Sequence, residues 1–160
     1  MLELGRSGSH GSGKGVLPVL DGDVVVATLR ASNWREAATA DVAGRVWEFQ
    51  RNGGRELTGR WAAEPVGAAR VRARQASYWT GSWTVDLEGT LVEVTTTSWW
   101  KGTHRYCTGG RPLAESGTTG AWSMRPTLSP EPGLPLDHAV FLLWFELVLS
   151  RRTAAVAAAV

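Results

Sequence analysis

The sequence predicts a mainly β domain of short antiparallel strands, followed by one buried helix near the C-terminus. Turn signals recur about every ten residues between short runs rich in Val, Thr, Trp and Tyr, which is typical of a sandwich or a barrel. Within several runs, apolar and polar residues alternate, as in a sheet with one packed face and one wet face. The only long apolar run is Ala139–Leu149. A helix that is apolar all round must be buried on every side.

Composition limits the class of protein. A chain of 160 residues is long enough for one domain with a substantial core. The net charge of +2 offers no general field for nucleic acid, and no nucleic-acid-binding motif is present, so we expect no such partner. Cys107 is the single cysteine, which excludes an intrachain disulfide. The segment Met1–Lys14 lacks the apolar stretch of a signal peptide. We therefore expect a cytoplasmic monomer.

The first segment is rich in Gly and Ser. Residues Gly8–Gly15 nearly spell a phosphate-binding P-loop, but Gly15 stands where Ser or Thr would hold magnesium. The following residues, Val16–Leu20, contain a proline and are typical of a strand rather than of a helix. We interpret residues 1–15 as a flexible arm and residues 16–160 as a single domain.

Strands and hairpin turns fill the middle of the chain. Asp21-Gly22 and Asn52-Gly53 favour two-residue hairpin turns. The segment Asn33–Ala40 is ambiguous, because Asn33 and Glu36 could form a helix capping box. We favour a strand there, because a hairpin-like Ala43-Gly44 follows. The clearest predicted strands are Val24–Leu29, Val46–Phe49, Leu57–Trp61, Trp83–Leu87 and Leu91–Thr95.

The character of the chain changes at Arg125. Four prolines between residues 126 and 135 predict an extended connector, because proline cannot sit in a sheet interior. Asp137 suits a helix N-cap, and the helix is expected over residues 136–152. Arg151 and Arg152 then lie where a helix C-terminus favours cations. The remaining residues, mostly Ala, either continue the helix or fray.

This order of elements resembles the tubby C-terminal-like superfamily, particularly its LURP-one-related and phospholipid-scramblase branch. The matching parts are the Trp-bearing strands from Val24 to Met124, the connector Pro126–Pro132 and the helix Leu136–Leu149. The resemblance implies a closed antiparallel β-barrel of about 12 strands around a hydrophobic C-terminal helix, and closure would leave no exposed strand edges. The absence of Ile and the scarcity of Lys indicate a GC-rich, bacterial member.

The resemblance also directs attention to lipids, because tubby-like proteins are associated with phosphoinositides and scramblases with membrane lipids. Arg70, Arg72 and Arg74 share one face of a predicted strand, and guanidinium groups suit phosphate. The simpler interpretation is that they form a solvated outer face. Trp99 and Trp100 are adjacent, so on a strand they would point to opposite faces and leave one exposed for a membrane or a partner.

One charged residue interrupts the apolar helix. Glu146 is expensive to bury unless it is paired, and it shares a helical stripe with His138 and Ser150. We expect Glu146 to meet an arginine of the barrel wall or to point to the barrel mouth; an acid working inside a cavity is the alternative. His104, His138 and Cys107 show no metal spacing and no catalytic triad, so we expect no catalytic residue, metal or cofactor.

The sequence thus favours a non-enzymatic barrel domain that binds anionic phospholipid or a membrane surface through its outer face. The alternatives are a calycin-like barrel for small ligands, which needs a lumen free of the helix, and a protein-interaction scaffold. A membrane tail anchor is disfavoured, because the apolar segment is short, holds Glu146 and ends at Arg151.

Overall fold

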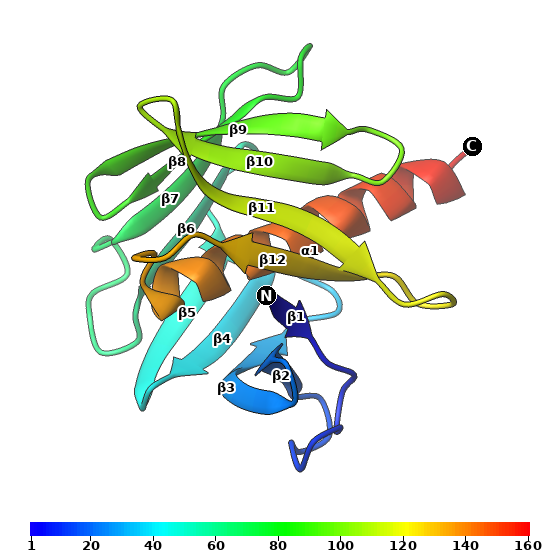
Figure 1. The fold of residues 1–160 in the computed structure, drawn as a ribbon. Coiled ribbons are helices and arrows are strands. Elements are labelled where there is room, and N and C mark those ends of the chain that lie inside the picture. The colour runs from blue at the N-terminus through cyan, green and yellow to red at the C-terminus, as the bar shows by residue number, and fades with distance from the viewer.

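The computed structural model describes residues 1–160 and is a closed barrel of twelve antiparallel strands around one helix (Figure 1). From β2 to β12 each strand pairs with the next strand of the chain, and β1 lies between β2 and β12 and closes the barrel. The predicted fold class is confirmed. The elements are β1 (Leu2–Leu4), β2 (Leu17–Asp21), β3 (Val24–Ala31), β4 (Ala37–Val42), β5 (Arg45–Arg51), β6 (Glu56–Trp61), β7 (Val71–Gln75), β8 (Trp83–Leu87), β9 (Thr90–Ser98), β10 (Thr103–Thr108), β11 (Arg111–Thr119), β12 (Arg125–Pro130) and α1 (Leu136–Ala158).

The beginning of the chain differs from the predicted arm. Leu2–Leu4 forms β1, in which both leucines are buried and Leu2 pairs with Leu128 of β12. Two apolar residues two positions apart are too short a pattern to identify a strand from periodicity. Residues 5–16 then form a loop with internal hydrogen bonds, among them one of 2.8 Å from the Gly15 N–H to Ser7 Oγ. This loop leads into β2 and not into the helix that a P-loop requires.

The predicted proline-rich connector is also partly wrong, because its first residues form β12. Pro126 is buried in this strand, and Pro130 ends it. The three-residue strand β1 pairs with β12 only at Thr127 and Leu128, so both prolines lie outside that pairing, Pro126 directly before it and Pro130 two residues after it. A proline without an N–H is tolerated where one flank of a strand has no partner.

The helix fills the lumen of the barrel. It begins after Pro135 and not after Asp137, so the predicted N-cap is wrong; the Asp137 carboxylate accepts the N–H of His138 in the first turn instead. Every residue from His138 to Glu146 is buried. Phe141 and Trp144 pack against Phe49 of β5, with ring centroids 5.3 and 5.2 Å away. Burying each large apolar side chain stabilises the fold by about 1.5–3 kcal/mol.

The far end of the helix is fastened to the β3–β4 hairpin. The Arg152 guanidinium donates two hydrogen bonds of 2.6 Å to the Glu36 carboxylate, and these bonds lower the pKa of Glu36. Arg151 donates a 2.7 Å hydrogen bond to the carbonyl of Ser32. The helix continues past the predicted end at residue 152 to Ala158. It does not combine the length and apolar character needed to cross a membrane.

The wall has a tight contact at Gly59 of β6, which yields a stability prediction. A Cβ added there would lie 2.6 Å from Val71 Cγ2 and 2.9 Å from Phe49 Cδ1. We expect Gly59→Ala to lower the free energy of unfolding by about 1–3 kcal/mol, because the packed wall must shift. Urea unfolding measures this loss. Gly54→Ala is the control, because its Cβ would meet open space. Equal stability of the two variants would contradict the packing described here.

Candidate functional site

The two ends of the barrel carry different loops. In an antiparallel meander, successive connections alternate between the ends, so every second hairpin lies at the same end. The contact between Arg152 and Glu36 places the C-terminal part of α1 at the end that holds the β3–β4 hairpin. Figure 1 shows the helix running through the barrel and out beside the β9–β10 and β11–β12 hairpins. We call this end the tryptophan rim; it comprises loops 5–16, 32–36, 52–55, 76–82, 99–102 and 120–124 and the helix end 150–160.

Every exposed aromatic ring of the protein lies on the tryptophan rim. The remaining tryptophans are buried or half-buried in the barrel, and all three phenylalanines are buried. The exposed rings come from four separate hairpins and are between 69% and 100% exposed. They are Trp34, Tyr78, Trp79, Trp99, Trp100 and Trp122.

Trp99 and Trp100 lie together on this rim, but not as predicted. They belong to the turn between β9 and β10, and both are exposed. Their rings stack on each other with centroids 3.6 Å apart. Because they are in a turn, the alternation of a strand does not separate them. Sequence reasoning missed Trp34 and Trp122 as members of this group. One signal could have found them: in a meander every second connection lies at the same end of the barrel, and Trp34 and Trp122 both lie in connections of that set.

Charge is also distributed unequally between the two ends. On the tryptophan rim, Glu36 is the only acid, and it is already paired with Arg152. The basic residues of this rim are Arg6, Lys14, Arg35, Arg55, Lys101, Arg151 and Arg152. The connections at the other end, with the first turn of α1, form the acidic rim. Within these connections and this turn, Arg70 is the only Arg or Lys, and the acids are Asp23, Glu64, Glu88, Glu131 and Asp137; Arg45 begins β5 beside them.

The predicted arginine face lies around β7, and acids accompany all three residues. Arg72 and Arg74 point outward, while Val71 and Ala73 between them are buried, as the alternation predicted. Both guanidinium groups contact the carboxylate of Glu56, at 3.5 and 3.1 Å.

Arg70 precedes β7 on the acidic rim and is held more firmly. Its Nε lies 2.9 Å from both oxygens of Glu64, and these hydrogen bonds lower the pKa of Glu64. Glu88 lies 3.6 Å away on another side of the same guanidinium. The ladder of Arg70, Arg72 and Arg74 is therefore largely neutralised by neighbouring carboxylates.

Glu146 has partners other than the predicted arginine. Its two carboxylate oxygens each lie 3.0 Å from Nδ1 of His104, and the Tyr106 hydroxyl donates to Oε1. A bulge between Thr103 and His104 shifts the register of β10 at this point. Tyr106 is fully buried, and burial together with the nearby Glu146 carboxylate raises its pKa well above the ordinary value of 10. The network satisfies the one carboxylate inside the barrel.

His138 does not join this network. It lies near the other end of α1, where its Nε2 is 3.9 Å from Glu88. No group of three or more His, Cys, Asp or Glu residues is arranged to hold a metal ion.

Comparison with known proteins gives no relative: no protein-family model, no curated protein and no solved structure matches the chain.

The buried network predicts a pH dependence of stability. The pKa of Tyr106 is higher in the folded state than in the unfolded state. The contribution of Tyr106 to the stability of the fold is therefore fully present below about pH 10 and is lost as the pH rises through the folded-state pKa. We expect Tyr106→Phe to cost about 1–3 kcal/mol near neutral pH, because a donor to a buried carboxylate is removed. We also expect this variant to lose less stability than the wild type between about pH 8 and about pH 11.

Urea unfolding at the two pH values measures both effects. Tyr78→Phe is the matched control. Because Tyr78 is exposed, this substitution should leave the wild-type pH profile unchanged. The interpretation fails if Tyr106→Phe and the wild type lose the same stability at alkaline pH.

Proposed function

We propose that the protein binds the surface of anionic membranes through the tryptophan rim. The observation that supports this most is the gathering of all exposed aromatic rings at one end of the barrel. Tryptophan and tyrosine favour the membrane interface, because an apolar ring and a polar N–H or O–H there face different surroundings. Four hairpins would then lower their rings into the headgroup region together.

Basic side chains on the same rim support a negatively charged partner. The side chains of Arg6, Lys14 and Lys101 make no ion pair and no hydrogen bond within the protein, so they are free for phosphate. A basic residue near an anionic bilayer contributes about 1 kcal/mol to binding. The arginine face at β7 is less suitable, because Glu56 and Glu64 already pair with it. We therefore assign the contact to the rim and not to the outer face.

Aromatic and basic residues together also occur in proteins that bind single-stranded nucleic acid. Such sites stack successive bases along a groove. Here the rings lie on the tips of separate hairpins around the end of a barrel, and they line neither the groove beside the β4–β5 hairpin nor the one between β3, β4 and β5. This arrangement favours a flat partner such as a membrane over a strand that follows a groove.

A ligand inside the lumen, as in calycins, is less well supported. Phe141, Trp144 and Phe145 of the helix pack directly against the inner face of the wall. The order of twelve strands and one enclosed helix supports a distant relation to the tubby-like proteins, which we also propose. Function as a binding domain without catalysis is part of the same proposal.

Vesicle binding tests the membrane proposal. We expect the protein to co-sediment with phosphatidylcholine vesicles that contain about a quarter phosphatidylglycerol, and to bind less well as salt is raised. Replacing Trp34, Trp79 and Trp122 together with Ser should weaken binding roughly tenfold or more, because each ring that leaves water contributes on the order of 1.5–3 kcal/mol when fully buried.

The control replaces exposed apolar residues away from this rim, Val66→Ser with Leu91→Ser, and should leave binding unchanged. A second variant replaces Arg70, Arg72 and Arg74 with Ala. It separates the contribution of the rim to vesicle binding from that of the outer face. Equal vesicle binding by the wild type and the triple tryptophan variant would refute the proposal. So would tighter, tryptophan-dependent binding to single-stranded RNA than to vesicles.

A further inference from the structure

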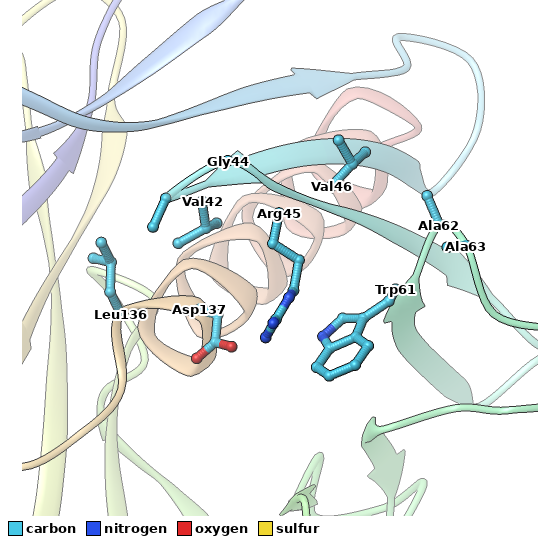
Figure 2. A pocket seen from close by; sticks show the side chains of 10 residues that line it. Val42, Gly44, Arg45, Val46, Trp61, Ala62, Ala63, Leu136 and Asp137 are labelled. Atoms are coloured by element: carbon cyan, nitrogen blue, oxygen red, sulfur yellow. The ribbon is translucent and has the colours of Figure 1, made fainter.

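A groove of about 820 Å³ opens at the acidic rim, at the opposite end from the proposed membrane contact. It lies between the β4–β5 hairpin, the residues that follow β6 and the first turn of α1 (Figure 2). Its lining is mostly apolar and comes from three segments far apart in the sequence. The apolar side chains are Val42, Ala43, Val46, Trp61, Ala62, Ala63 and Leu136.

Two opposite charges border this groove without pairing. In Figure 2 the Arg45 and Asp137 side chains extend in the same direction, and the Arg45 guanidinium lies between the Asp137 carboxylate and the Trp61 ring in this view. They are not within ion-pair distance of each other, and neither makes an ion pair elsewhere, although Arg45 lies near enough to Glu64 to help lower the pKa of that carboxyl. The Asp137 carboxylate accepts only the N–H of His138. The Arg45 side chain makes no hydrogen bond, and it stacks over Trp61 with its Cζ 3.9 Å from the ring centroid.

The two faces of the Trp61 ring differ in a way that points to a ligand. Arg70 covers one face at 3.3 Å and is fully engaged by Glu64 and Glu88. Arg45 covers the other face with its donors unused. The Trp61 Nε1–H is buried and also has no acceptor. A buried donor without a partner is unusual in a folded protein. Unused donors thus occur both on Trp61 itself and on the arginine that stacks over it.

The wall of the groove is held in place before any ligand arrives. Nη1 of Arg60 donates hydrogen bonds to the carbonyls of Trp61, Ala62 and Glu64, at 3.2, 3.3 and 2.7 Å, and Nη2 pairs with Glu48. These bonds fix the path of the chain after β6. A ligand would thus meet a largely pre-formed surface, which lowers the entropic cost of binding.

We propose that this groove binds a short apolar peptide with free ends, its carboxylate on Arg45 and its ammonium on Asp137. The apolar body would lie on Val42 and Leu136. A ligand with a single charge would leave either Arg45 or Asp137 partly desolvated and unpaired, which costs affinity. The groove falls in the usual size range of small-ligand sites and is roomier than one amino acid needs. The proposal is independent of membrane binding, which uses the other end of the barrel.

Isothermal titration calorimetry with leucyl-leucine tests the site. Two modified peptides each remove one charge: the N-acetyl form lacks the ammonium, and the C-terminal amide lacks the carboxylate. We expect the wild-type protein to bind each modified peptide about tenfold or more weakly, because a charge-assisted hydrogen bond is lost. Since these comparisons use the wild-type protein, they do not depend on the folding of any variant.

Arg45→Gln and Asp137→Asn identify the partner of each end. Arg45→Gln should weaken the binding of leucyl-leucine about tenfold. It should leave the binding of the amide unchanged, because the amide lacks the carboxylate that Arg45 would bind. Asp137→Asn should do the same for the acetylated peptide. The proposal is overturned if leucyl-leucine does not bind saturably, if a modified peptide binds as tightly as the free one, or if neither variant changes its affinity.

Discussion

A barrel of twelve strands encloses more space than the side chains of its own wall can fill, and the rest of this structure depends on filling it. Barrels of about eight strands close on their own side chains, whereas wider ones leave a lumen. Here α1 occupies it with Phe141, Trp144 and Phe145, while wall positions such as Ala40 and Ala73 stay small. This explains why the buried part of the helix is apolar on every side although the helix is not long and apolar enough to cross a membrane. The same requirement made the fold predictable from Ala139–Leu149.

The carboxylate of Glu146 is the exception in this apolar filling. Its partners His104 and Tyr106 both come from β10, so any other rotation of the helix would leave a charge buried without donors. The sequence identified Glu146 as needing a partner. It did not identify which one, because the pairing spans about forty residues and depends on the strand register and on a bulge at Thr103.

Local patterns in the sequence predicted the strands well and the ends of the barrel poorly. Val46–Phe49 was predicted as a strand, in which Trp47 and Phe49 share the buried face, and Asn52-Gly53 marked a turn, because both signals act over a few residues. β1 was missed because three residues carry too little pattern, and β12 because proline argues against strands unless a flank is free. The aromatic and basic rim differs from the acidic rim only once the connections are sorted by the end of the barrel at which they lie. That sorting puts distant segments such as 32–36 and 120–124 together, and it requires the strand topology.

The short strand β1 has a consequence for how the chain folds. All twelve strands can assemble as successive hairpins, β1 with β2 included, but the seam closes only when Leu2 reaches Leu128, across nearly the whole sequence. Contacts of such high sequence separation form slowly, so β1 and β12 are open edges during that interval. Pro126 and Pro130 cannot donate hydrogen bonds to a passing strand. The prolines that disguised β12 in the sequence thus protect the unclosed barrel from pairing with its neighbours.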